Sequence, residues 1–265
     1  MASGTRVVVT GAGGGIGAAL AEAFAAAGAE VVVNDLDAAA AREVAARIGG
    51  HPVPGDAAGR DGVAALIEAA RAELGGGIDV YCANAGVAPG GGADAPEQSW
   101  AAAWEVNVMA HVRAAELLLP EWLERGAGRF VATVSAAGLL TMLGSAPYSV
   151  SKHGALAFAE WLSATYRHRG VRVHALCPQG VRTRILEESG AVGRALLADG
   201  ALEPSQVAAE VLRAIGEERF LVLPHPEVAG YYAHRAADPD GWLVGMNQLQ
   251  RKLVDGLEPN VEGTQ

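Results

Sequence analysis

The sequence predicts an α/β protein built on a doubly wound, mostly parallel sheet of about seven strands with helices on both faces. Short β-branched runs alternate with Ala-rich helical stretches along the 265 residues, which is the pattern of repeated βαβ units. Several of the strand-like runs are apolar throughout, as strands covered on both faces are. The first of them ends in a glycine-rich turn, which makes the expected sheet Rossmann-type.

Each expected element follows from a local pattern. The seven strand-like runs are residues 6–10, 30–34, 52–53, 78–83, 128–135, 171–177 and 220–223. The helical stretches between them are residues 15–28, 38–48, 59–74, 98–125, 148–169 and 204–217. Crossovers should be right-handed, and ligands should bind beyond the carboxyl ends of the strands.

Composition narrows the class of protein. The net charge is −10 without a block of like charge, which argues against nucleic acid or an anionic membrane as the main partner. Cys82 and Cys177 each sit near the end of an apolar run, so both are expected to be small buried residues rather than metal ligands or a disulfide. No metal spacing, signal peptide or membrane span is visible, and the expected location is the cytoplasm.

The expected organisation is one domain over residues 1–257 and a disordered tail over residues 258–265. Before that tail, apolar residues including Tyr231, Trp242 and Met246 suggest an apolar helical face. His225 and His234 have no ligand-like partners, so packing or surface roles are expected.

The first carboxyl end reads Thr10-Gly11-Ala12-Gly13-Gly14-Gly15-Ile16-Gly17 and runs into a helix. Such a turn lets a helix N-terminus approach a pyrophosphate, whose charge the free N–H groups and the helix dipole favour. The alternative is that the glycines only allow close packing of the chain and bind no phosphate. No Gly-Lys-Ser/Thr follows, so a Walker phosphate loop is excluded.

Asp35 ends the second strand, 18 residues after Gly17. A carboxylate there can accept hydrogen bonds from both ribose hydroxyls of NAD and would repel the 2′-phosphate of NADP. Neither Leu36 nor the turn from Ala12 to Gly14 supplies an Arg or Lys. The alternative is that Asp35 caps the helix after it, although Asp37 suits that role better.

Three further strand ends carry polar or small residues. Asp56 could bind the adenine amino group or simply cap a turn, and Asn84, Ala85 and Gly86 follow the fourth strand. Ser135 ends the fifth strand, and 13 residues later Tyr148 opens a helix in which Lys152 shares its face. A cation beside a phenol favours the phenolate, so the pair can serve as acid and base. Such a pair alone occurs by chance on surface helices; its place after Ser135 and the glycine turn favours catalysis.

The chain resembles the single-domain branch of the short-chain dehydrogenase/reductase superfamily, from Thr5 to about Leu223. The glycine turn, Asn84-Ala85-Gly86, Asn107, Ser135, Tyr148 and Lys152 stand in the order and spacing of that family's motifs. Two positions depart from the pattern. Ala83 replaces an Asn before Asn84, and Gln179 replaces a Gly in the motif that runs from Pro178 to Thr183.

The resemblance implies a catalytic tetrad of Asn107, Ser135, Tyr148 and Lys152, acting with NAD and without a metal. Tyr148 would move the substrate proton, Ser135 would hydrogen-bond the substrate oxygen, and Lys152 would hold the nicotinamide ribose. Asn107 would bend its helix and hold a relay water. The implied cofactor contacts are Gly11, Gly13, Gly15, Ile16, Gly17, Asp35, Leu36, Asp56, Ala57, Asn84, Ala85, Gly86, Tyr148, Lys152, Pro178, Val181 and Thr183.

The expected substrate is a small to medium, largely apolar secondary alcohol or ketone, contacted by Ser135, Leu143, Tyr148 and Gln179. The resemblance also implies that residues 1–257 form a catalytic domain and that residues 184–203 form a substrate lid. Charged residues of this lid, such as Glu188 and Arg184, could contact a polar group, although solvated lid charges are the favoured interpretation. Relatives bury their long helices between subunits, and the surplus of apolar residues such as Trp104 and Trp161 predicts a homotetramer.

Three other functions are compatible with parts of this pattern. A redox-sensing regulator would bind NAD without catalysis and would tolerate a broken tetrad, but all four members of the tetrad are present here. A sugar-nucleotide epimerase shares the Tyr-x-x-x-Lys pair but usually carries a larger C-terminal domain. A methyltransferase with a glycine turn would not need Ser135, Tyr148 and Lys152 together.

Overall fold

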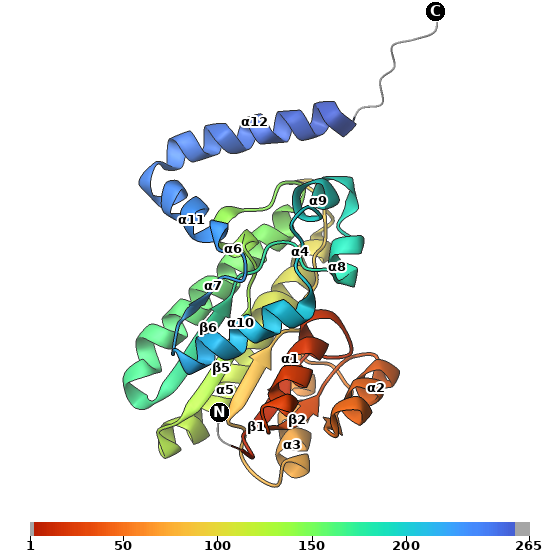
Figure 1. The fold of residues 1–265 in the computed structure, drawn as a ribbon, viewed down its shortest axis with the longest axis vertical. Coiled ribbons are helices and arrows are strands. Elements are labelled where there is room, and N and C mark those ends of the chain that lie inside the picture. Colours follow the sequence, from red (N-terminus) through yellow and green to blue (C-terminus); the bar gives the residue numbers. More distant parts are fainter. Residues whose placement is uncertain (1–2, 258–265) are drawn as a thin grey trace, which may run out of the picture.

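The structure, a computed structural model, describes residues 3–257, so the expected disordered tail lies outside the described residues. Seven parallel strands form one sheet in the order β3-β2-β1-β4-β5-β6-β7 (Figure 1). They are β1 (Arg6–Val9), β2 (Glu30–Val33), β3 (His51–Pro52), β4 (Val80–Ala83), β5 (Gly128–Thr133), β6 (Val171–Leu176) and β7 (Leu221–Val222). The predicted doubly wound sheet is confirmed, and its order reverses between β1 and β4.

Helices cover both faces of the sheet. α1 (Gly15–Ala26), α2 (Ala38–Ile48) and α10 (Pro204–Gly216) share a core with one face. α3 (Arg60–Glu73), α5 (Ala110–Arg125) and α7 (Ala146–Tyr166) share a core with the other. Val8 lies in the second core, whereas Val7 and Val9 lie in the first. This explains why the strand-like runs are apolar at every position.

The helix expected over residues 98–125 is continuous but changes its winding. α4 (Glu97–Trp104) passes into η1 (Glu105–Met109), a π-helical turn centred on Asn107, and then into α5. A π-turn inserts one extra residue and often marks a functional position. The predicted bend at Asn107 therefore takes the form of a wider turn, which sets Asn107 apart from its neighbours.

Most of the remaining helices lie around the carboxyl ends of the strands. α6 (Ala137–Leu140) precedes α7, whereas η2 (Arg167–Arg169) follows α7 and lies at the amino end of β6. α8 (Arg184–Glu187) and α9 (Gly190–Leu197) fill the stretch expected to form a lid. α11 (Glu227–Ala237) and α12 (Pro239–Leu257) form the helical tail, and α12 lies beyond α11 and α9, farthest from the sheet (Figure 1).

The described residues also bear on the cysteines, on metal ligands and on membrane spans. Cys82 and Cys177 are buried and unpaired, as expected. Within residues 3–257, no group of His, Cys, Asp and Glu is placed to hold a metal ion. No helix in this part of the chain is both long and apolar enough to cross a membrane.

Candidate active site

A large cavity of about 1320 Å³ opens at the carboxyl ends of the strands, around the reversal between β1 and β4. Every residue predicted to bind cofactor or substrate lines it, and so do three of the four expected catalytic residues: Ser135, Tyr148 and Lys152. Asn107 is the exception, because it lies fully buried outside the cavity wall. Residues that are 180 positions apart in the sequence, such as Gly11 and Ala191, thus meet in one site.

The glycine turn gives the cavity a backbone wall. Gly11 has a φ of +60°, and a Cβ there would lie 2.8 Å from the Cα of Ala85. A Cβ on Gly17 would lie 2.1 Å from the carbonyl oxygen of Gly11. Close packing therefore explains these two glycines. Gly14, in contrast, faces open space, and no side chain caps the N-terminus of α1, so its first N–H groups are left for an anion such as a pyrophosphate.

Asp35 borders this turn at the end of β2. Its Oδ2 accepts a hydrogen bond from the N–H of Gly13 at 2.9 Å, and its Oδ1 accepts one from the N–H of Asp37 at 3.0 Å. Asp37, not Asp35, caps α2 by accepting from Ala39 and Ala40. The capping alternative for Asp35 is therefore wrong. Each carboxylate oxygen keeps a free lone pair for a ribose hydroxyl, and Leu36 beside it is exposed.

Asp56 caps a turn, which was one of the two roles that the sequence allowed. Its carboxylate accepts hydrogen bonds from the N–H groups of Ala58 at 2.8 Å and Gly59 at 2.9 Å, which caps the turn before α3. It still borders the cavity. The turn-capping alternative is thus confirmed, and an adenine contact would be an additional role.

Asn84 ties three strand ends together. Its Nδ2 donates to the carbonyl oxygens of Thr10 and Gly11, and its Oδ1 accepts from the hydroxyl of Thr133. The Thr10 hydroxyl in turn accepts from the N–H groups of Asn84 and Ala85. The floor of the cavity is therefore cross-linked from β1 through β4 to β5 although Ala83 lacks a polar side chain.

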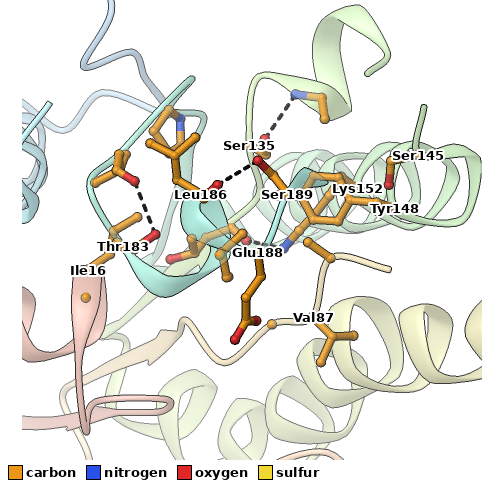
Figure 2. Close-up of a pocket in the computed structure, with 18 of the residues that line it drawn as sticks. Ile16, Val87, Ser135, Ser145, Tyr148, Lys152, Thr183, Leu186, Glu188 and Ser189 are labelled. Atoms are coloured by element: carbon orange, nitrogen blue, oxygen red, sulfur yellow. Dashed lines mark hydrogen bonds between the residues drawn. The ribbon is translucent and has the colours of Figure 1, made fainter. Parts of the chain in front are cut away.

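Ser135, Tyr148 and Lys152 stand in one wall of the cavity, drawn in Figure 2 with Leu186, Glu188 and Ser189 of the stretch expected to form a lid. The Nζ of Lys152 donates to the carbonyl oxygen of Thr133 at 2.9 Å and lies 5.6 Å from the centre of the Tyr148 ring. Ser135 has a φ of +137°, which is a strained conformation for a residue with a side chain. Its Oγ accepts from the N–H of Ala137 at 3.1 Å.

Burial dominates the acid–base properties of this wall. It lowers the pKa of Lys152 to about 8. Burial also raises the pKa of Tyr148, and this effect is larger than the opposite effect of the hydrogen bond with Ser135. Lys152 is expected to lower the phenol pKa, but desolvation sets the direction of the shift in this structure. An ammonium at pH 7 beside a neutral phenol is still the protonation state from which Tyr148 can donate.

The low pKa of Lys152 predicts a pH-dependent contribution to stability. The folded protein loses this proton near pH 8, whereas the unfolded chain keeps it up to about pH 10.4. Between pH 8 and 10 the unfolded state thus binds more protons, so stability gains with rising pH. The difference in free energy of unfolding, wild type minus Lys152→Met, should rise by about 2 to 3 kcal/mol over this range. Urea unfolding followed by circular dichroism measures it; a difference independent of pH would contradict the burial of a charged Lys152.

Asn107 connects the cavity wall to the interior. Its Oδ1 accepts from the N–H of Val87 at 3.0 Å, and its Nδ2 donates to the Val87 carbonyl at 2.9 Å and to the Ser151 hydroxyl at 3.0 Å. These bonds hold the loop after β4 against α7, next to Lys152. Because they use both N–H groups of the amide, a relay water at this residue would have to donate to Oδ1 or to the backbone carbonyl.

The profile of the short chain dehydrogenase family matches residues 5–192. The chain belongs to that family. Among characterised proteins, it is 37% identical over 229 residues to 1-deoxy-11-beta-hydroxypentalenate dehydrogenase of Streptomyces exfoliatus, covering 83% of this chain and 82% of the relative. The family dehydrogenases act on alcohol or ketone groups with a nicotinamide cofactor, and this chain is therefore an oxidoreductase of that class.

Two solved structures show how widely this dehydrogenase fold is used. A short chain dehydrogenase/reductase from Burkholderia phymatum in complex with NAD matches with a TM-score of 0.82 and 29% identity, covering 90% of this chain and 95% of the other. L-sorbose reductase from Gluconobacter frateurii, complexed with NADPH and L-sorbose, matches with a TM-score of 0.72 and 26% identity, covering 83% and 95%. Similar folds thus hold either cofactor, and the choice depends on local residues.

The dehydrogenase has features of its own that the sequence motifs did not reveal. Gln179, an expected substrate contact, lines the cavity, and its N–H makes an unforeseen hydrogen bond to Nδ1 of His225 at 3.1 Å. His225 is buried, so the expected packing role includes support for this loop. Trp242, Met246 and Leu249 of α12 also line the cavity. Their helical spacing was readable in the sequence, but nothing in it says where the helix docks.

Proposed function

We propose that this dehydrogenase transfers a hydride between NAD(H) and a small to medium, largely apolar secondary alcohol or ketone, with Tyr148 as general acid and base. The observation that carries the proposal is the meeting of Ser135, Tyr148 and Lys152 with the glycine turn and Asp35 in one cavity. Such a meeting of an acid–base group and a fitting dinucleotide cradle satisfies what hydride transfer requires of the protein.

In the oxidation direction, Tyr148 takes the hydroxyl proton of the substrate as its carbon loses a hydride. Bound NAD supplies the acceptor for that hydride. Ser135 hydrogen-bonds the substrate oxygen and stabilises the charge that develops on it. In reduction each transfer runs backwards, and Tyr148 donates the proton.

Lys152 and Asn107 support this proton transfer. The ammonium of Lys152 is fixed by Thr133 and lies beside the Tyr148 ring, where it favours the phenolate that oxidation requires. We place the nicotinamide ribose against the same ammonium. Asn107 positions the wall through Val87 and Ser151.

Asp35 supports NAD as the cofactor. Its carboxylate is held in the cavity wall by Gly13 and retains lone pairs that suit a ribose diol. The exposed neighbour, Leu36, offers no charge to a 2′-phosphate. Asp56 and Ala57 would border the adenine, while Pro178, Val181 and Thr183 would border the nicotinamide side.

The walls of the cavity support a largely apolar substrate. Leu143, Ile185, Leu186 and Leu196 line it together with the amide of Gln179. Glu188 also borders the cavity, but it is exposed and pairs with Arg184 at 3.5 Å. This pairing supports the interpretation that these lid charges are solvated rather than substrate ligands.

The test is the absorbance of NADH at 340 nm while secondary alcohols are offered with NAD. NADH is expected to form steadily with at least one apolar alcohol, and one molecule of ketone should form for each NADH. NAD binding without turnover across the panel would instead favour a redox-sensing module. Interconversion of a sugar nucleotide without net NADH would favour an epimerase, and methyl transfer would favour the third class.

We further propose that the dehydrogenase is a homotetramer. Trp104 of α4 and Val150 and Trp161 of α7 are about half exposed, and the Phe158 and Trp161 rings stack beside them. Val108, Leu118 and Leu156, in contrast, are already buried within the chain, so the surplus is smaller than the sequence suggested. Light scattering should give four times the mass of one chain, and Trp161→Lys should lower it. A wild-type monomer at micromolar concentration would reject the tetramer.

A further inference from the structure

α12 turns an apolar side toward the cavity. Trp242, Met246 and Leu249 line the cavity, and their spacing of four and three residues puts them on one face of the helix. Leu243 and Val244, on other faces, are 64% and 59% exposed. The helix therefore presents two distinct apolar surfaces, of which only the first borders the site.

The position of α12 is set by the helix before it. α11 is anchored by Val228, which is fully buried, and by Arg235, which donates to the carbonyl oxygen of Leu139 in α6. At Asp238 the backbone leaves the helical region, and the Asp238 carboxylate accepts from the N–H of Gly241 at 2.9 Å. This restarts the chain as α12. The Trp242 ring meets the His234 ring edge-on at 6.0 Å, so the two helices are joined at the turn.

Across the cavity, α12 faces other apolar elements. It contacts α9, and the cavity is also lined by Leu186, Val192 and Leu196 from the lid and by Met142 and Leu143 from the loop before α7. Met246 is half-buried, and Leu249 is 36% exposed. A larger apolar substrate would cover this surface, whereas a small alcohol bound at Tyr148 would leave it in water.

We propose that α12 is a wall of the substrate site and that Trp242, Met246 and Leu249 select an apolar secondary alcohol larger than a single six-membered ring. The alcohol carbon lies at Tyr148, and the rest of the molecule lies between the lid and α12. The proposal rests on the proposed function and adds the size of the substrate to it.

The experiment compares two alcohols in three proteins. Cyclohexanol and decahydronaphthalen-2-ol differ by one fused ring, and kcat/KM is measured with NAD for the wild type, Met246→Asp and Val244→Asp. The wild type should favour the fused-ring alcohol. Met246→Asp should lower kcat/KM for that alcohol by about tenfold or more and leave cyclohexanol within about twofold, because one lost apolar contact has effects of this size. Val244→Asp adds the same charge on another face and should leave both values within about twofold.

Two results would overturn the proposal. One is an equal loss in both variants, which would mean that α12 acts through its outer face, as in contact with a second copy. The other is an equal loss for both alcohols in Met246→Asp. Should that variant melt at a lower temperature than the wild type, Met246→Ala repeats the comparison without a buried charge, and the same selective loss is required of it.

A binding measurement separates this proposal from the proposed function. Titration calorimetry of decahydronaphthalen-2-ol into protein saturated with NADH, which cannot accept a hydride, should show weaker binding in Met246→Asp and unchanged binding in Val244→Asp. Failure of the wild type to oxidise either alcohol would count against the proposed function, while the calorimetric comparison would still decide the role of α12. Equal binding to all three proteins would overturn that role.

Discussion

Tyr148→Phe is expected to lower kcat by a factor on the order of 10² or more while leaving NAD binding nearly unchanged. The substitution keeps the aromatic ring in the cavity wall and its contact with Lys152, but it removes the hydroxyl, the only group of the side chain that can exchange a proton. The loss therefore falls on the chemical step. Stopped-flow and steady-state absorbance of NADH measure turnover, and quenching of protein fluorescence by NADH measures cofactor binding.

Tyr166→Phe is the matched control for this substitution. Tyr166 lies at the end of the same helix, where its ring meets Trp161 edge-on, and it does not line the cavity. The control should retain wild-type turnover. If Tyr148→Phe also retained near-normal turnover, Tyr148 could not be the group that exchanges the substrate proton.

The second large effect concerns cofactor choice: kcat/KM should be higher with NAD than with NADP by roughly two orders of magnitude. The Asp35 carboxylate would face the 2′-phosphate of NADP at close range, with Leu36 in place of a cationic partner. Repulsion of this kind costs a few kcal/mol, and each 1.4 kcal/mol is about tenfold. Both constants are measured with one alcohol.

The double variant Asp35→Ala, Leu36→Arg should narrow or reverse this preference, because it removes the repulsion and adds a phosphate partner. Asp61→Ala is the control, since Asp61 lies in the first turn of α3 outside the cavity wall and its loss should leave the cofactor ratio unchanged. Equal use of NAD and NADP by the wild type would show that Asp35 does not face the ribose.

Much of the fold was predictable because the strands are buried on both faces and end in turns with distinctive residues. The three valines of β1 alternate between the two helix layers, so their unbroken apolar run marks a central strand. Parallel strands bring their carboxyl ends to one edge, and this geometry gathers Asp35, Asn84 and Ser135 at one cavity. Their order along the chain, together with the family resemblance, was enough to predict that these residues lie in one cavity.

Other features depend on contacts between distant parts of the chain, and the sequence alone could not decide their form. The π-turn at Asn107 forms where its amide bonds to Val87 and Ser151, neither of which is near it in sequence. The turn-capping role of Asp56 depends on the conformation of the loop that follows. The placement of α12 depends on the break at Asp238 and on Arg235 reaching α6. In each case the local pattern allowed more than one arrangement.

The central claim is direct hydride transfer between the substrate carbon and the cofactor, with the proton passing separately through Tyr148. An alcohol oxidised by the wild type, deuterated at its carbinol carbon, tests it in one measurement with NAD. Mass spectrometry should find one deuterium in each NADH formed and none released to water. Unlabelled NADH, with the deuterium in the solvent, would contradict the claim.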